Sequence, residues 1–213
     1  VALEQRPISL TRNAKQSASL NCKILNPVSD YVHWYRSQEG RATERLLVYS
    51  RSKSESVPDP GFSADKVRAY KGADDTCRLI VSDLQVSDSG VYHCASWDRY
   101  NNDWIKNFGE GTQLVILQSS AFKKKPPKPI FFLPTSEEIK QKQSGTYICL
   151  LEDFFPNVVK TYWKEDGNSQ PLDAQFGPIT GGGNSYSQVS WLTVKEDVLR
   201  KNLTYFYQHE DLG

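Results

Sequence analysis

The sequence predicts an all-β chain that folds into two β-sandwich domains in tandem. Segments of alternating apolar and polar residues, the pattern of half-buried strands, recur in both halves of the 213 residues. Between the halves lies a polar stretch stiffened by prolines, residues 119–127, which we interpret as an extended, semi-rigid linker. The first domain is therefore expected to span residues 1–118 and the second residues 128–213.

Composition restricts the classes of partner. Lys and Arg number 26 and Asp and Glu 25, so the formal net charge of +1 indicates neither nucleic acid nor an anionic membrane. No apolar run approaches the length of a membrane span, and Val1 begins neither a signal peptide nor a transit peptide. We expect a mature, soluble segment.

Strands of the first domain are expected at residues 17–23, 31–35, 46–49, 66–70, 77–84, 88–94 and 112–117. In the first of these, Leu20 and Cys22 share one face, so Cys22 points inward. Cys77 alternates in phase with Leu79, and we interpret it as a buried, unpaired thiol rather than a reactive one. The four cysteines allow three pairings, among which spacing alone does not choose.

The stretch from Cys94 to Gly111 is the strongest functional candidate. Two predicted strands flank it, and residues 97–106 between them mix aromatic, charged and amide side chains. Hairpin loops usually have roughly two to five residues, so a longer one is more typical of function than of a simple connection. Tyr and Trp supply large contact areas at low entropic cost, which is the chemistry of a recognition loop.

The second domain shows the same strand pattern. Residues 146–150 alternate, Trp163 lies in another expected strand, and residues 189–194 form a third. Gly181–Gly183 should break any regular element and form a mobile loop. The lysine run at 123–125 is interpreted as solvated linker charge rather than as a membrane or anion patch.

Several separated motifs resemble one known family. Cys22, Trp34, Asp88-x-Gly-x-Tyr-x-Cys94 and Phe108-Gly-x-Gly111 resemble the variable domain of an antigen receptor with its joining segment. More narrowly, His33-Trp-Tyr-x-x-Gln-Glu-Gly40, Arg45-Leu-Leu-x-Tyr49, Trp97-Asp-Arg99 and Asp103-Trp-Ile-Lys106 are similar to T-cell receptor gamma chains. Pro127–Pro134, Gly145–Glu152, Phe154–Pro156 and Ser190–Val194 are similar to a gamma constant domain.

The resemblance implies two immunoglobulin-like sandwiches, variable-type and then constant-type. It implies a Cys22–Cys94 disulfide between the sheets, Trp34 packed on that bond and Tyr92 at the tyrosine corner. It further implies an antigen-recognition subunit on the extracellular side of the plasma membrane. The implied partners are a delta chain or related receptor chain, CD3-type signalling subunits, and a protein or lipid-presenting ligand of unidentified kind.

Two positions of the second domain depart from the family pattern. Tyr205 stands where the family carries the disulfide partner of Cys149, and Gly213 is reached before a last strand can be placed. The absence of an inter-sheet disulfide removes about 2–4 kcal/mol of stabilisation from the domain. Either a partner chain stabilises this domain, or Cys149 pairs with a group outside this sequence. Our hypothesis is the first, with Cys149 a buried free thiol.

Three loops of the variable-type domain should cluster at one end, at about residues 26–31, 50–55 and 95–107. The antigen-binding candidates are Tyr31, Arg51, Trp97, Arg99, Tyr100, Asn101, Asn102, Asp103 and Trp104. The alternative is that Trp97 and Trp104 pack at the base of the last loop, which moves the expected contacts to residues 99–103.

Outward aromatic side chains on the strands that carry Trp34 and Cys94 suggest a second buried surface, against another variable domain. The candidates for this chain-to-chain interface are Tyr35, Leu46, His93 and Phe108. Ser37 stands where antibody variable domains usually place an interface glutamine, so the antibody contact set is not transferable.

Other polar residues are assigned structural or peripheral roles. Asp88 should form an ion pair with Lys66 or Arg68, worth little if exposed. Asn202-Leu-Thr204 is a glycosylation sequon.

Catalysis is not expected, and neither is a metal or a cofactor. His33, His93 and His209 lie in no metal-binding or nucleophile motif, and Gly109-x-Gly111 lacks the helix that phosphate binding requires. His33 and His93 lie on neighbouring strands, but a pair without a third ligand is more typical of interface packing. The competing interpretations are an immunoglobulin light chain, a beta-type receptor chain, or an invariant two-domain adhesion protein.

Overall fold

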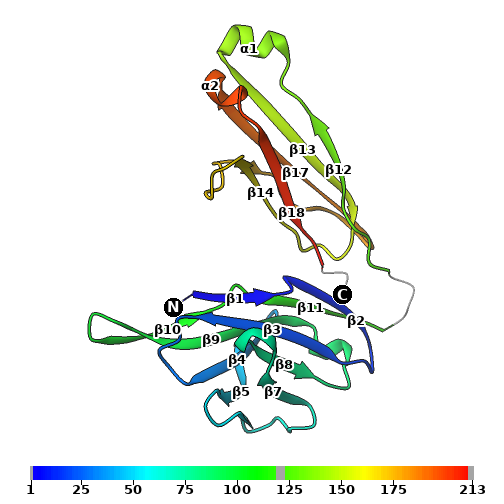
Figure 1. Ribbon diagram of the computed structural model, residues 1–213. Coiled ribbons are helices and arrows are strands. Elements are labelled where there is room, and N and C mark those ends of the chain that lie inside the picture. The colour runs from blue at the N-terminus through cyan, green and yellow to red at the C-terminus, as the bar shows by residue number, and fades with distance from the viewer. Residues whose placement is uncertain (1, 119–122, 211–213) are drawn as a thin grey trace. The chain divides into compact units, whose positions relative to one another are not determined.

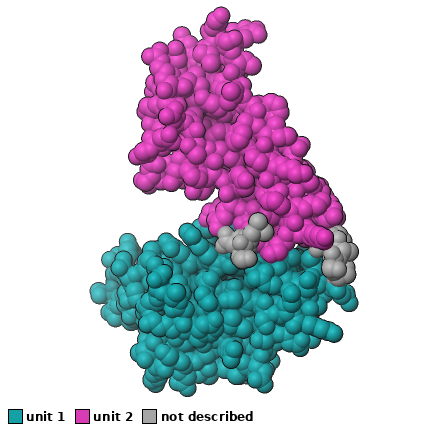
Figure 2. Space-filling model, turned by 45° about the vertical axis from the view of Figure 1, so that its right-hand side comes forward, with its two compact units in different colours: residues 1–121, 211–213 teal, residues 122–210 magenta. Residues whose placement is uncertain are grey.

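The computed structural model describes residues 2–118 and 123–210 (Figure 1). The chain divides into two compact units (Figure 2). Each unit has its own hydrophobic core. Both units consist mainly of strands, which confirms the all-β prediction. Among the described residues, no helix has the length and apolar character needed to cross a membrane.

The first unit contains two sheets. One has the order β1-β3-β8-β7 and consists of β1 (Ala2–Arg6), β3 (Ala18–Leu25), β7 (Val67–Lys71) and β8 (Cys77–Val81). The other has the order β2-β11-β9-β4-β5-β6, with β10 added to β9, and consists of β2 (Ser9–Asn13), β4 (Tyr31–Ser37), β5 (Glu44–Ser50), β6 (Glu55–Pro58), β9 (Gly90–Tyr100), β10 (Asp103–Phe108) and β11 (Thr112–Leu117). Two 3-10 turns, η1 (Ala73–Asp75) and η2 (Val86–Asp88), precede β8 and β9.

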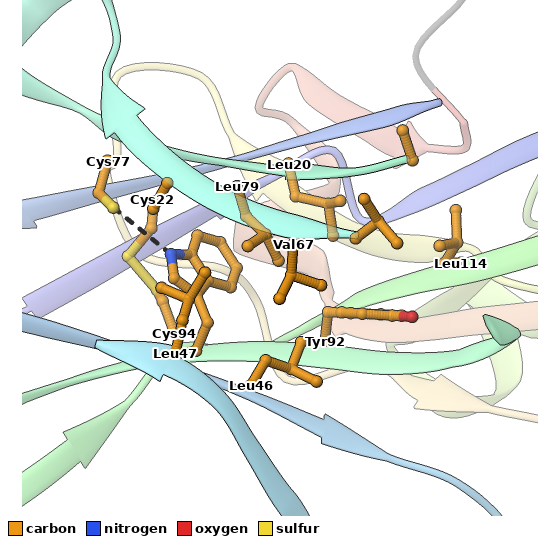
Figure 3. Close-up of a cluster of buried hydrophobic side chains, with 14 of the residues drawn as sticks. Leu20, Cys22, Leu46, Leu47, Val67, Cys77, Leu79, Tyr92, Cys94 and Leu114 are labelled. Carbon is orange, nitrogen blue, oxygen red and sulfur yellow. Dashed lines mark hydrogen bonds between the residues drawn. A yellow bond between two sulfur atoms is a disulfide. The ribbon is translucent and has the colours of Figure 1, made fainter. Parts of the chain in front are cut away.

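A disulfide joins the two sheets through the core. Cys22 of β3 and Cys94 of β9 are bonded at 2.05 Å, which confirms the pairing implied by the family resemblance. Figure 3 shows Cys22, Cys94 and Cys77 within this core. Trp34 is fully buried in the same core, and its indole Nε1 donates a hydrogen bond to the Sγ atom of Cys77 at 3.4 Å. Burial raises the pKa of the Cys77 thiol to about 12, so this unpaired cysteine is an inert core residue, as predicted.

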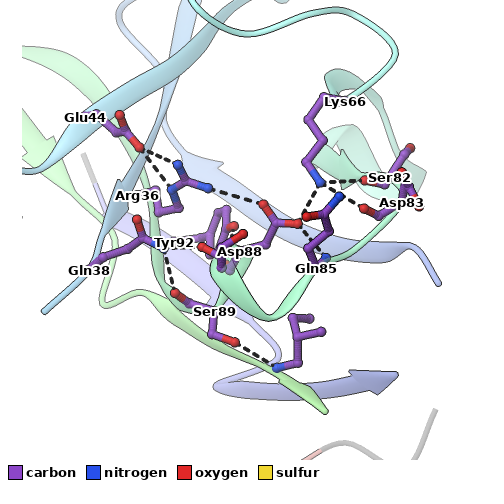
Figure 4. A network of polar contacts seen from close by, with 12 residues as sticks. Arg36, Gln38, Glu44, Lys66, Ser82, Asp83, Gln85, Asp88, Ser89 and Tyr92 are labelled. Carbon is purple, nitrogen blue, oxygen red and sulfur yellow. Dashed lines mark hydrogen bonds and ion pairs between the residues drawn. The ribbon is translucent and has the colours of Figure 1, made fainter. Parts of the chain in front are cut away.

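The ion pair predicted for Asp88 is buried. The Asp88 carboxylate lies 2.6 Å from the Lys66 ammonium and 3.5 Å from the Arg36 guanidinium (Figure 4). The backbone carbonyl of Asp88 accepts a hydrogen bond from the Tyr92 hydroxyl at 2.7 Å. Lys66 is therefore the partner, and Arg68 is not. The side chain of Asp88 is only 7% exposed, so the small stabilisation expected for an exposed ion pair does not apply here.

We predict that Asp88→Asn destabilises the first unit by about 2 kcal/mol, because the substitution leaves the Lys66 ammonium beside a neutral amide. Urea unfolding followed by tryptophan fluorescence measures the change. Asp83→Asn is the matched control, since Asp83 is exposed on the same turn and contributes only its backbone carbonyl to Lys66. Equal losses in both variants would show that the buried charge is not what matters.

The second unit also contains two sheets. The larger has the order β12-β13-β17-β15, with β16 added to β17, and consists of β12 (Lys128–Phe132), β13 (Ser144–Phe154), β15 (Gln175–Phe176), β16 (Thr180–Gly182) and β17 (Ser185–Lys195). The smaller pairs β14 (Lys160–Glu165) with β18 (Leu203–Gln208), which has no second neighbour in the described part of the chain. Helices α1 (Ser136–Lys142) and α2 (Glu196–Leu199) connect strands.

The triple-glycine segment was predicted incorrectly. Gly181 and Gly182 pair with Tyr186 and Ser185 as part of β16, rather than interrupting regular structure. The physical reason is that Gly183, with φ of 66°, lies in the tight turn that reverses the chain into β17.

Tyr205 occupies the position of a missing disulfide partner. It lies opposite Trp163 in the β14–β18 pair, just as Cys94 lies opposite Trp34 in the first unit. The two rings meet edge-on with their centroids 4.8 Å apart. Cys149 is fully buried and unpaired, as hypothesised, and burial raises the pKa of its thiol to about 11 while a hydrogen bond with Tyr205 acts in the opposite direction.

Part of the predicted linker belongs to the second unit. Residues 119–122 lie outside the described residues, but Lys125 forms a β-bridge with Phe155. The Lys124 and Lys125 ammonium groups form ion pairs with Glu210 at 3.0 Å and Asp153 at 3.2 Å. The interpretation of the lysine run as solvated charge is therefore wrong at these two positions.

Candidate recognition site

The predicted long loop at 95–107 is a β-hairpin instead. Strands β9 and β10 pair continuously from Tyr100 opposite Asp103 to Ala95 opposite Phe108, and the hairpin extends from the body of the first unit (Figure 1). Only Asn101 and Asn102 form the turn, with φ of 47° and 67°. A two-residue turn of this kind needs positive φ at both positions, which Asn tolerates better than most residues. The two adjacent asparagines indicate such a turn, but the prediction of a long loop considered only the length of the segment.

One face of the hairpin alternates indole rings with cations. The register places Trp97 opposite Lys106 and Arg99 opposite Trp104. The Lys106 ammonium lies 5.3 Å from the Trp97 ring centroid, and the Arg99 guanidinium 5.3 Å from that of Trp104. The Lys106 ammonium also donates a hydrogen bond to the Tyr35 hydroxyl and lies 4.8 Å from the centroid of the Tyr35 ring. These cation–π contacts link the hairpin face to the sheet below it.

Trp97 and Trp104 border a pocket. Together with Ser29 from the connection between β3 and β4, they line a cavity of about 350 Å³. Trp104 is 51% exposed, so the alternative in which it packs at the base of the loop is wrong. Trp97 is half-buried.

The three predicted segments meet at this end of the unit. Asp30 joins two of them, since its carboxylate accepts hydrogen bonds from the Ser50 hydroxyl at 2.6 Å and the Ser52 amide at 2.7 Å. The Ser50 contact is the largest cause that lowers the pKa of Asp30. Ser96 of the hairpin donates to the Tyr31 carbonyl at 3.2 Å and connects the third segment. Sequence reasoning missed Asp30, because nothing in its local pattern marks it as a link between loops.

The remaining antigen-binding candidates differ in accessibility. Tyr31 is 48% exposed and Tyr100 65% exposed, and the turn residues with Asp103 are exposed at the tip of the hairpin. Arg51 is half-buried, and its guanidinium lies 2.5 Å from the Asp75 carboxylate. Its charge is therefore already neutralised within the unit.

Three of the four residues predicted for a chain-to-chain interface, Tyr35, His93 and Phe108, lie on the outer face of the larger sheet. Phe108 is 53% exposed, and its ring centroid lies 5.3 Å from that of Tyr35. His93 is half-buried, and its Nδ1 atom lies 2.9 Å from the Gly109 carbonyl oxygen. Leu46 was predicted for this surface, but that prediction is wrong because Leu46 is fully buried in the core.

A β-bulge explains the error at Leu46. Trp34 lies opposite Leu47 and Tyr35 lies opposite Arg45, so Leu46 is an extra residue on β5. Strand alternation assigns opposite faces to neighbouring residues, but a bulge breaks that alternation, and both leucines turn inward.

His33 lies beneath the same face in an unusual environment. It is 7% exposed, its Nδ1 atom lies 3.3 Å from the Arg45 guanidinium, and its buried Nε2 atom has no hydrogen-bond partner among the described residues. Arginine only donates, so Nδ1 accepts and Nε2 carries the proton. The pKa of His33 is lowered to about 4, mainly by burial and to a smaller extent by repulsion from Lys106 and Arg45.

His33 therefore makes the stability of the first unit depend on pH. The unfolded chain protonates this histidine near pH 6.5 and the folded chain only near pH 4, so the unfolded state binds more protons in between. We predict that the free energy of unfolding falls as pH is lowered through this window, by up to roughly 3 kcal/mol. Urea titrations at pH 7 and pH 4.5 measure the loss.

His33→Gln should flatten this pH dependence, whereas the control His209→Gln, in the other unit, should leave it unchanged. A slope that is the same in both variants and the parent would exclude His33 as its source.

The larger sheet of the second unit has a second apolar face that sequence reasoning missed. The strand registers place six apolar side chains on the face away from buried Cys149: Ile130, Phe132, Ile148, Leu150, Val189 and Trp191. Phe132 is 52% exposed and Ile130 40% exposed. The sequence of β13 could have indicated this face, because both sets of its alternating residues include apolar side chains, as in a sheet covered on both sides. The sequon residue Asn202 is exposed and directly precedes β18.

No group of three or more His, Cys, Asp or Glu side chains suited to a metal ion occurs within residues 2–118 and 123–210. The arrangement instead offers an exposed aromatic hairpin and two apolar sheet faces. Exposed aromatic and apolar surfaces of this kind are typical of protein interfaces.

Comparison with known proteins agrees with this architecture. Residues 5–117 match the immunoglobulin V-set domain and residues 130–206 the immunoglobulin C1-set domain. The chain is 40% identical over 97 residues to human T cell receptor gamma variable 8, covering 46% of this chain and 82% of that protein. It is 42% identical over 85 residues to the constant region of a mouse T-cell receptor gamma chain, and the match covers 40% of this chain and 45% of that protein.

The chain thus spans less than half the length of this constant-region relative. Among solved structures, a marsupial T cell receptor is 92% identical with a TM-score of 0.93, covering 100% of this chain and 94% of that chain. A second marsupial T cell receptor is 64% identical with a TM-score of 0.89, covering 100% of this chain and 96% of that chain. The chain belongs to the T-cell receptor family, as a gamma-type chain with a V-set and a C1-set immunoglobulin domain.

Proposed function

We propose that this T-cell receptor chain is the antigen-recognition subunit of a heterodimer on the extracellular side of the plasma membrane. The β9–β10 hairpin, with the connections at 26–31 and 50–55, forms part of the ligand-binding surface. The observation that carries this proposal is the exposure of Trp104 and Tyr100 on a hairpin that the disulfide-bonded V-set frame supports. Exposed aromatic side chains on an ordered support are typical anchors of protein recognition.

Pairing with a delta chain or a related receptor chain would cover the two apolar faces. In the first unit this is the surface around Tyr35, His93 and Phe108. In the second unit it is the face that contains Phe132 and Trp191, and burial of that face compensates for the absence of a disulfide at Cys149. Exposed apolar faces of this kind are typical of protein interfaces. The C1-set domain also supports association with CD3-type signalling subunits, and Asn202 carries a glycan.

Purification of the full chain from the surface of its native cells tests the pairing. We expect a delta-type or related receptor chain to co-purify in equal amount. Phe108→Ser should lower the recovered partner by about tenfold, because the substitution removes an exposed apolar anchor. Val86→Ser is the matched control, since Val86 is 49% exposed on η2 and lies on neither apolar face. Recovery of the chain alone would contradict the heterodimer.

Sequencing the transcript from many cells of one animal tests the recognition role. We expect residues from Arg99 to Asp103 to vary between cells while the flanking strands stay constant. An identical hairpin in every cell would instead support an invariant adhesion protein.

A further inference from the structure

The two faces of the β9–β10 hairpin carry opposite charge. Because side chains alternate along each strand, the face with Trp97 and Trp104 also carries Arg99 and Lys106, whereas Asp98 and Asp103 point to the other side with Tyr100 and Ile105. The first face thus combines two indole rings with two cations. We call it the indole–cation face.

The two cations of this face lie on aromatic rings rather than on carboxylates. Arg99 lies over Trp104, and Lys106 lies between Trp97 and Tyr35. In the described part of the chain, neither cation has a carboxylate within ion-pair distance. A cation over a ring retains most of its capacity to attract an anion, since the ring carries no net charge.

The adjoining cavity is suited to an aromatic ring. It is a wide, open pocket of about 350 Å³ at the surface, bordered by Trp97, Trp104 and Ser29. Stacked or edge-on contacts with the indoles would hold a planar group there. A positively charged ring is disfavoured, because Arg99 and Lys106 already occupy positions over these rings.

We propose that the indole–cation face binds a small aromatic anion, whose bicyclic ring enters the cavity at Trp97 and Trp104 and whose carboxylate or sulfonate meets Arg99 and Lys106. This inference rests on the proposed recognition role and specifies the ligand class of that site. The class follows from charge complementarity and from the size of the cavity.

Three probes that share one ring system separate the contributions: 2-naphthoate, 2-naphthalenemethanol and 2-naphthylmethylammonium. Each is titrated into the intact chain, and the indole N–H signals of its five tryptophans are followed by NMR. We expect the signals of Trp97 and Trp104 to shift. Naphthoate should bind about fivefold more tightly than the neutral probe, and the cationic probe should bind most weakly.

Variants assign the effect to residues. Trp104→Ala should weaken naphthoate binding about tenfold, and Arg99→Gln should reduce the preference for naphthoate over the alcohol to about twofold. Ile105→Ala is the matched control, because this residue is 44% exposed, lies on the opposite face of the hairpin and is not among the recognition candidates, and the substitution should change neither value. Equal binding of the three probes, or shifts only at other tryptophans, would overturn the proposal.

These outcomes are independent of the co-purification and sequencing experiments. If naphthoate fails to bind while the partner chain is recovered and residues 99–103 vary, the ligand class is wrong and the receptor role remains supported.

Discussion

Removing the Cys22–Cys94 disulfide by Cys22→Ala with Cys94→Ala is expected to destabilise the first unit by about 4 kcal/mol. The bond closes a loop with a sequence separation of 72 residues, and a cross-link of that length restricts the unfolded chain strongly. Since domains have a net stability of roughly 5–15 kcal/mol, much of the folding free energy depends on this bond. Urea unfolding of the oxidised parent and the double variant measures the difference.

Cys77→Ala provides the control. Cys77 is buried like the disulfide and accepts the hydrogen bond of Trp34, but it forms no cross-link. Its substitution should cost about 1 kcal/mol, from lost packing. If the double variant lost no more than Cys77→Ala, the disulfide would not be the main constraint on the frame that supports the hairpin.

Tyr205→Ala is expected to destabilise the second unit by about 3 kcal/mol. The ring contacts Trp163 edge-on, its centroid lies 5.9 Å from that of Phe131, and its hydroxyl is hydrogen-bonded with Cys149. Its removal therefore leaves a cavity at the position where the family resemblance implies a disulfide. Thermal and urea unfolding monitored by near-UV circular dichroism measure the loss. Tyr205→Phe should retain most of the stability, because it keeps the ring.

Phe206→Ala is the neighbouring control. Phe206 is 40% exposed and stacks on Tyr162 at the surface, so its loss should cost about 1 kcal/mol. A Tyr205→Ala variant as stable as Phe206→Ala would show that this tyrosine does not replace the disulfide.

The strands of the first unit were predictable because most of them bury one face only. Alternation is a direct consequence of a two-residue side-chain period, so Leu20 and Cys22 were correctly placed in the core, whereas the core position of Trp34 followed from the family resemblance. Leu46 was not, because a bulge depends on pairing between strands, which the local sequence does not encode clearly.

The recognition site was predictable in composition but not in conformation. Its aromatic and charged residues marked the segment, whereas the pairing of β9 with β10 depends on tertiary support and on two asparagines at positive φ. Arg51 was predicted from its loop position alone, and its ion pair with Asp75 brings together residues of separate segments. The apolar outer face of the second unit was overlooked because Phe132 and Trp191 come to lie on either side of Ile148 only when the sheet is assembled.

The proposed recognition surface lies on an ordered hairpin rather than on a mobile loop. Backbone ¹⁵N relaxation of the intact protein tests this order residue by residue. We predict order parameters of about 0.8 or higher from Arg99 through Trp104, close to those of the flanking strands. Values below about 0.6 across these residues would contradict an ordered hairpin.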